Sequence, residues 1–86
     1  MDTVYLLKSL SFPDKTYVGL TIKSPKIRTS EHNKGKSDYS RNFRPWKLIY
    51  YEQFCCRLCA EKREAFLKSG FGYRLRKLIA KHYTEL

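Results

Sequence analysis

The first apolar run of the sequence, Val4-Tyr5-Leu6-Leu7, is the feature that most constrains the fold. A short continuous run of this kind is typical of a strand that is covered on both faces. Residues 11–15 then have the composition of a turn, and residues 16–22 alternate between two faces. One face carries Thr16, Val18, Leu20 and Ile22, and the other carries Tyr17 and Gly19. We therefore expect a β-hairpin, in which Gly19 leaves room beside Tyr17 for a ligand or a close backbone.

A helix is expected directly after the hairpin. Ser24 is a good N-cap, and Pro25 fits the first helical position, where its missing N–H costs nothing. Gly35 fits a C-terminal stop. Arg28 and His32 are four residues apart, so they share one face of this helix and point in the same direction.

The second half of the chain adds one strand and two helices. Residues 38–45 are polar and basic and are expected to form a loop, whereas residues 46–51 favour a third strand. Residues 55–68 have helical propensity, Ser69-Gly70 breaks the pattern, and a last helix is expected from about Tyr73 to Tyr83. This order predicts an α+β fold, and 86 residues suffice for only one core.

The chain is strongly basic, with 18 Lys and Arg against 8 Asp and Glu and a net charge of +10. Polyanions are the expected partners of so basic a domain. The excess is concentrated between Lys23 and Lys47, which favours a phosphate-binding surface over an ordinary solvated one. The positions expected to contact nucleic acid are Lys23, Lys34, Lys36, Arg41, Arg44 and Lys47.

Three aromatic residues in the same stretch have two interpretations. Tyr39, Phe43 and Trp46 are interleaved with arginines, so they could stack on exposed bases. For Phe43 and Trp46 we expect a place in the core instead.

The sequence has no feature that points to a membrane. No apolar run approaches the roughly 20 residues that a membrane span needs. The first residues also lack a basic lead into an apolar stretch. We therefore expect a cytoplasmic protein without a membrane partner.

Three cysteines, Cys55, Cys56 and Cys59, lie within five positions of one another. Their odd number suits reduced thiols better than a disulfide framework. A zinc site is the alternative, but only His32 and His82 could complete it. Buried or half-buried free thiols are the expected arrangement.

Glu64 interrupts a helical stripe that is otherwise small or apolar, formed with Cys56, Ala60 and Leu67. A carboxylate at such a position is costly unless it is paired or bound to a cation. The alternative is a carboxylate at the edge of the stripe that reaches solvent or pairs with Lys68.

Four other candidate residues can also be explained by a structural role. Arg28 could be a solvated surface charge, and His32 could be favoured near the helix C-terminus by the dipole. Tyr5 and Tyr17, each taken alone, fit core or rim aromatics.

Taken together, these residues resemble the motifs of the GIY-YIG nuclease family. Thr3-Val4-Tyr5 and Tyr17-Val18-Gly19 resemble the paired tripeptides that name the family, with Thr3 in place of the first glycine. The segment from Arg28 to Asn33 is similar to the family's Arg-x-x-x-His-Asn helix, and the segment from Arg63 to Lys68 is similar to the helix with the metal-binding glutamate. Arg44 to Glu52 is similar to the third strand of the short, stand-alone bacterial members.

The resemblance, which runs from about Val4 to Ile79, implies a fold and a site. The fold is a small three-stranded antiparallel sheet with the first strand central, flanked by helices, in a single endonuclease domain over residues 1–86. The catalytic positions are Tyr5, Tyr17, Arg28, His32 and Glu64, accompanied by Gly19 and Lys68. Glu64 would hold one divalent ion, Mg²⁺ or Mn²⁺, because Mg²⁺ accepts a single carboxylate completed by waters and a phosphate oxygen.

The resemblance also implies roles. The ion would stabilise the leaving 3′ oxygen, and Arg28 would offset charge on the scissile phosphate. Tyr5 is the family's usual candidate for the base, and His32 is its rival because histidine titrates near neutral pH. Tyr17 and His32 would place the water or the phosphate, or assist proton transfer.

The predicted function is a divalent-metal-dependent endonuclease that hydrolyses DNA phosphodiester bonds in repair or recombination. Its target would be a DNA structure such as a branch, flap or nick, or a protein partner would supply the target. RNA as the substrate is one alternative. A non-catalytic nucleic-acid-binding module that retains the fold is the other, and the oligomeric state is left open.

Overall fold

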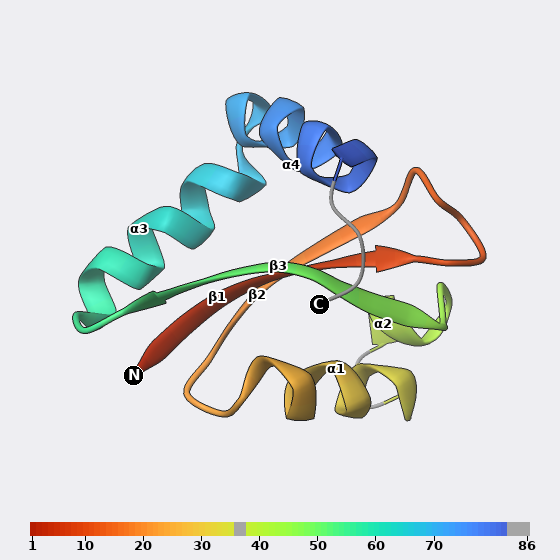
Figure 1. The fold of residues 1–86 in the computed structure, drawn as a ribbon, viewed down its shortest axis with the longest axis horizontal. Coiled ribbons are helices and arrows are strands. Elements are labelled where there is room, and N and C mark those ends of the chain that lie inside the picture. Colours follow the sequence, from red (N-terminus) through yellow and green to blue (C-terminus); the bar gives the residue numbers. More distant parts are fainter. Residues whose placement is uncertain (36–37, 83–86) are drawn as a thin grey trace.

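The sheet has three antiparallel strands in the order β2-β1-β3, so the first strand is central, as predicted. The strands are β1 (Asp2–Ser9), β2 (Thr16–Thr21) and β3 (Trp46–Phe54). Figure 1 shows this computed structural model, which describes residues 1–35 and 38–82. The expected α+β class is confirmed.

The central strand is buried on both faces, which explains its continuous apolar sequence. Each residue from Thr3 to Leu7 is at most 2% exposed. Tyr5 lies opposite Gly19 on β2 and opposite Tyr51 on β3. The sheet therefore holds Tyr5 between two neighbouring strands.

Helices cover both faces of the sheet (Figure 1). Helices α1 (Pro25–Asn33) and α2 (Asp38–Arg41) lie on one face, and α3 (Arg57–Lys68) and α4 (Gly70–His82) lie on the other. The core under α3 and α4 consists of Val4, Leu6, Val18, Ile49, Ala60, Leu67, Ile79 and Ala80. The core on the opposite face consists of Tyr5, Leu7, Trp46 and Leu48, with Tyr17 and Phe43 packed against it.

Helix α1 begins and ends where its sequence predicts. The Ser24 hydroxyl accepts a hydrogen bond from the Lys26 N–H at 3.3 Å, and Pro25 occupies the first turn. After the helix, Gly35 has a φ of +82°, a conformation that side chains disfavour. These two ends fix how Arg28 and His32 face the sheet.

Three expectations about local structure were wrong. The expected loop over residues 38–45 contains the short helix α2. The last helix begins at Gly70 rather than Tyr73, and Tyr83 lies outside the described residues. Ile22 lies beyond the end of β2 and is 76% exposed, so it does not extend the buried face of that strand.

Helix α4 begins before the predicted residue because Ser69 caps its N-terminus. The Ser69 hydroxyl accepts a hydrogen bond from the Gly72 N–H at 3.3 Å, and the Ser69 carbonyl accepts one from the Tyr73 N–H. A Cβ at Gly72 would collide with the Phe66 carbonyl oxygen, so the glycine allows α4 to pack closely on the end of α3. No helix in residues 1–35 or 38–82 is long and apolar enough to cross a membrane.

Candidate active site

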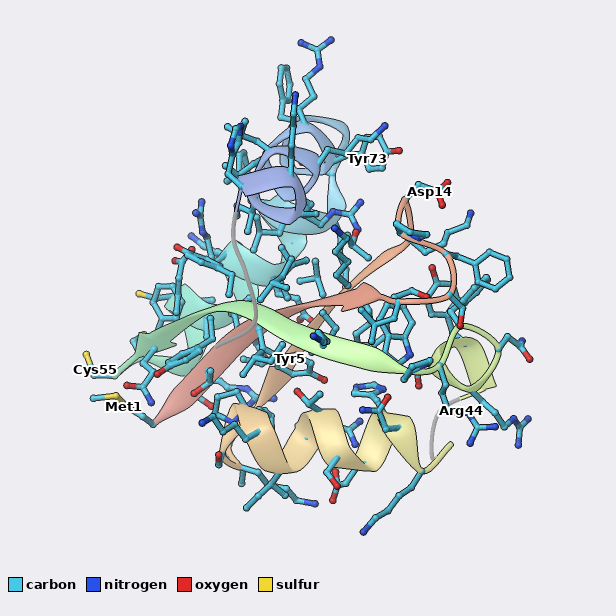
Figure 2. The ribbon with its side chains drawn as sticks, turned by 45° about the vertical axis from the view of Figure 1, so that its right-hand side comes forward. Met1, Tyr5, Asp14, Arg44, Cys55 and Tyr73 are labelled. Carbon is cyan, nitrogen blue, oxygen red and sulfur yellow. The ribbon has the colours of Figure 1, made fainter. Side chains whose placement is uncertain are left out.

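Tyr5 lies at the centre of the candidate site, on the sheet face that α1 covers (Figure 2). The residue is 1% exposed. A Cβ at Gly19 would collide with the Tyr5 ring and hydroxyl. The space that Gly19 leaves is therefore filled by the Tyr5 side chain, not by a ligand or a close backbone as the sequence suggested.

His32 joins the Tyr5 hydroxyl to α2. Its Nε2 lies 2.9 Å from the Tyr5 hydroxyl, and its Nδ1 lies 2.8 Å from the Ser40 hydroxyl. Burial, and then the charge of Arg28, lower the pKa of His32 to about 4, so its ring is neutral at neutral pH. His32 lies in the last turn of α1, but its ring is fully buried and neutral, so it carries no charge for the helix dipole to favour.

Arg28 approaches the same hydroxyl from one helical turn earlier. Burial and the neighbouring Tyr17 raise the pKa of Tyr5, whereas the charge of Arg28 and its hydrogen bond to the hydroxyl lower it. Because Arg28 is a donor, the Tyr5 oxygen accepts from it and the Tyr5 O–H is left to donate to His32 Nε2. The His32 Nδ1–H then donates to Ser40, and all these groups have partners.

Glu31 holds the Arg28 guanidinium. Its carboxylate lies 2.8 Å from Arg28 on one oxygen and 2.8 Å from Lys23 on the other. Hydrogen bonds from Lys23 and Arg28 lower the pKa of Glu31 to about 2. The carboxylate therefore stays ionised at all working pH values and orients Arg28.

Glu64 contributes a negative charge from α3. This charge raises the pKa of Tyr5, so the carboxylate acts on the same hydroxyl as Arg28. The Glu64 side chain is 23% exposed and pairs with Lys68 at 3.2 Å, the partner that the sequence offered as its structural alternative. Its helical neighbours Ala60 and Leu67 are buried, as the stripe predicted, but Cys56 is exposed.

Tyr17 completes the group of predicted residues. Its ring centroid lies 4.5 Å from that of His32 and 6.3 Å from that of Tyr5. On its other side, the Tyr39 ring lies 5.9 Å away. Four of the predicted positions, on β1, β2 and α1, therefore lie together, and Glu64 on α3 acts on Tyr5 through its charge. Arg28 and Glu64 are partly exposed, whereas Tyr5 and His32 are buried.

The family model of the GIY-YIG catalytic domain matches residues 1–77 of the chain. The chain belongs to the GIY-YIG family. Comparison with curated proteins gave no match. Membership gives this GIY-YIG domain a nuclease-type function, that of a hydrolase acting on nucleic acid, and GIY-YIG nucleases generally use divalent metal ions.

The described part of the GIY-YIG domain offers few protein ligands for a divalent ion. Within the described ranges 1–35 and 38–82, no group of three or more His, Cys, Asp or Glu side chains is arranged around a metal position. Glu64 supplies one partly exposed carboxylate near Tyr5. This donor set fits Mg²⁺, which commonly binds one or two carboxylates and keeps several waters, and it does not fit a closed zinc site.

Three residues that support the site of the GIY-YIG domain were not assigned a role from the sequence. Ser40 binds His32, and no sequence signal marked it within the expected loop. Asn33, which follows His32 in the family motif, accepts from the Trp46 N–H at 2.6 Å and donates to the Trp46 carbonyl at 3.0 Å. Glu31 orients Arg28, and its i+3 spacing from Arg28 was the available signal.

The cations expected to contact nucleic acid lie on both faces of the sheet. Lys23 pairs with Glu31 beside Arg28, and Lys34 is exposed at the end of α1. Arg44 donates from Nε to the Arg41 carbonyl at 3.0 Å, which places both arginines near α2. Lys47 alternates with Trp46 and therefore faces the other side of the sheet, opposite Lys8 in register. Lys36 lies outside the described residues.

The aromatic and cysteine expectations have mixed outcomes. Trp46 is buried and Phe43 packs against its cluster, as expected, whereas Tyr39 is 46% exposed. The expectation of buried or half-buried thiols was wrong. The exposed cysteines are Cys55, Cys56 and Cys59.

Proposed function

We propose that this domain is a divalent-metal-dependent endonuclease that hydrolyses phosphodiester bonds in DNA, with Tyr5, Tyr17, Arg28, His32 and Glu64 as its catalytic residues. The observation that carries the proposal is the Tyr5 hydroxyl, which meets neutral His32, the Arg28 guanidinium and the charge of Glu64. A solitary core tyrosine needs none of these three neighbours. In catalysis at a phosphate, such neighbours can accept a proton, stabilise negative charge and hold a cation.

Arg28 and Glu64 are the groups that meet the substrate first, because they are partly exposed. The planar donor fork of Arg28, oriented by Glu31, would bind two oxygens of the scissile phosphate and stabilise its developing charge. Bound at Glu64, a Mg²⁺ or Mn²⁺ ion would supply a Lewis acid for the leaving 3′ oxygen and offset the carboxylate charge that raises the pKa of Tyr5.

Tyr5 and His32 form one proton path in this proposal, so the two rival bases act in sequence. The Tyr5 oxygen takes the proton of the attacking water as its own proton passes to His32 Nε2, 2.9 Å away. The Tyr5 hydroxyl lies between Arg28 and His32 Nε2, so in this proposal a water beside Arg28 reaches His32 only through Tyr5. For Tyr5 to reach the water, Arg28 must turn from its hydroxyl toward the phosphate. Tyr17, in contact with the His32 ring, would position the phosphate.

Nucleic acid would lie on the α1 and α2 side of the sheet. Lys23 adjoins Arg28 through Glu31, so phosphate contacts can continue from the candidate site along α1. Tyr39 is half exposed and lies beside Tyr17, which suits a ring that stacks on a base next to the cleaved bond. We propose a branched, flapped or nicked DNA substrate in repair or recombination, with a protein partner as the other source of target choice, and a cytoplasmic location.

Glu64→Gln is the decisive variant, because it removes the charge and keeps the shape. Plasmid, branched DNA and labelled RNA are incubated with Mg²⁺, Mn²⁺ or EDTA. We expect cleavage of DNA that EDTA abolishes and that Glu64→Gln slows by about a hundredfold or more, while DNA binding and the circular dichroism spectrum are retained.

Glu61→Gln is the matched control, since Glu61 lies on the same helix and pairs only with the exposed side chain of Arg57 in the described contacts. The Glu61→Gln variant should cleave DNA at the rate of the parent protein. Equal cleavage by Glu64→Gln and the parent would contradict the assignment of the site. Salt-sensitive binding without products would instead identify a non-catalytic module, and preferential cleavage of RNA would correct the substrate.

A further inference from the structure

The cysteine cluster lies at the junction of β3 and α3, away from the basic end of the candidate site. Strand β3 ends at Phe54, Cys56 is the N-cap of α3, and Cys59 lies in the first turn of that helix. Figure 2 shows Cys55 at one side of the molecule and Arg44 at the opposite side. The thiols are exposed and reduced, so small molecules can reach them.

We propose that Cys56 and Cys59 form a redox-active dithiol that a small-molecule disulfide of the glutathione type converts into an intramolecular disulfide. The spacing supports this pairing. Residues three apart at a helix start have Cα atoms roughly 5 to 6 Å apart and lie on one face, which is within the range of disulfide-bonded cysteines. Cys56 is the N-cap residue of α3 and Cys59 is the third residue of that helix, and both side chains are exposed.

The two thiols have different roles. The Cys59 N–H, the Cys59 thiol and the Leu58 N–H lower the pKa of Cys56, so Cys56 provides the nucleophilic thiolate. The hydrogen bond and the charge of Cys56 raise the pKa of Cys59, so Cys59 keeps its proton until Cys56 has reacted. One sulfur therefore attacks first and its neighbour resolves the product.

The reaction balances in two exchanges. The Cys56 thiolate attacks one sulfur of the small disulfide, forms a protein mixed disulfide and releases one small thiolate. Once the Cys56 charge is gone, Cys59 loses its proton to solvent, attacks the Cys56 sulfur and releases the second small thiolate. The two protein thiols are oxidised, and one small disulfide is reduced to two thiols.

The other arrangements of the cluster fit less well. Adjacent cysteines have Cα atoms about 3.8 Å apart, below the usual range for a disulfide of about 4.4 to 6.8 Å, which disfavours a Cys55–Cys56 bond. A zinc site needs a fourth ligand and commonly a tetrahedral set. The part of the chain that the structure describes has no cluster of three or more ligands placed for a metal.

The test uses the full chain, reduced and then incubated with oxidised and reduced glutathione at set ratios. Free thiols are trapped by alkylation, and the peptides are mapped by mass spectrometry. We expect an intramolecular Cys56–Cys59 disulfide with Cys55 alkylated. Cys55→Ser, the matched control, should form the same disulfide at the same rate.

Two further variants assign the order of the steps. Cys59→Ser should stop at a stable mixed disulfide on Cys56, and Cys56→Ser should lower the rate of the first exchange by about tenfold. A mixed disulfide on Cys55 as the main product, a bond that includes Cys55, or equal rates for Cys56→Ser and the parent would overturn the proposal. These readouts do not require nuclease activity, so failure here is separate from failure of the proposed endonuclease.

Discussion

Acidification should destabilise the domain through His32 well above the pH at which carboxylates titrate. The folded chain holds the pKa of His32 at about 4, against about 6.5 for an exposed histidine. Between these values the unfolded chain binds a proton that the folded chain does not. The stability due to neutral His32 is therefore complete above about pH 6.5 and is lost as the pH falls toward 4.

The size of the loss follows from the two pKa values. From roughly pH 7.5 to about pH 5, the free energy of unfolding should fall by about 2 kcal/mol through this one residue. Glu31 contributes little in this window, because its unfolded carboxyl, with a pKa of about 4.5, has only begun to bind a proton at pH 5. The pH dependence above 5 is thus assigned to burial of the ring between Tyr5 and Ser40.

Urea unfolding measures this loss. Trp46 is the only tryptophan and is buried, so its fluorescence reports the transition. The parent and His82→Gln, which changes the exposed histidine, should both lose about 2 kcal/mol between the two pH values, whereas His32→Gln should change little. A titration of the ring signals by NMR gives the pKa of His32 directly. A parent with equal stability at both pH values, or a His32 pKa near 6.5, would refute the reasoning.

Two further predictions concern the shape and the charge of the site. Gly19→Ala should push the Tyr5 ring aside, slow cleavage by about a hundredfold and lower stability by about 1 to 3 kcal/mol, as measured by nuclease assay and urea unfolding. Gly70→Ala is its control, because nothing lies within 4 Å of the added Cβ, and it should stabilise the domain by up to about 1 kcal/mol. Binding of uncleaved DNA through the cations near α1 and α2, which are Lys23, Lys34, Arg41 and Arg44, should weaken by about a hundredfold between roughly 50 and 200 mM salt, and a fluorescence titration that shows no salt dependence would contradict phosphate contact.

The sequence predicted the parts of the fold that depend on local pattern. The apolar run of β1, the alternation of β2 and the caps of α1 each depend on adjacent residues, so the hairpin, the burial of β1 and the shared face of Arg28 and His32 could be expected, whereas the sheet order was implied by the family resemblance. The resemblance then grouped residues of four elements into one candidate site. Periodicity alone could not have related Glu64 to Tyr5, because no local signal connects α3 with β1.

The parts that the sequence missed depend on contacts between distant segments. Helix α2 is supported by the Trp46 indole, which donates to the Ser40 carbonyl at 2.7 Å, and by His32 on the Ser40 hydroxyl. Helix propensity does not include either contact, because the partners are distant in the sequence. From helix propensity alone, Gly70 and Gly72 predict a break in the helix. In the structure they belong to α4, and the close packing of this helix on Phe66 requires a glycine at position 72.

Burial and charge divide the site into two layers with different tasks. Arg28 and Glu64 carry opposite charges at its accessible side, where a phosphate and a cation can replace their present partners Glu31 and Lys68. Behind them, Tyr5 and His32 are buried and uncharged at neutral pH, so their hydrogen bond survives the arrival of a charged substrate. An ionised base in the buried layer would need a permanent counter-charge, which would compete with the cation for the outer carboxylate. A buried layer that is neutral before the reaction avoids that competition, because His32 carries a charge only while it holds the proton that Tyr5 passes to it.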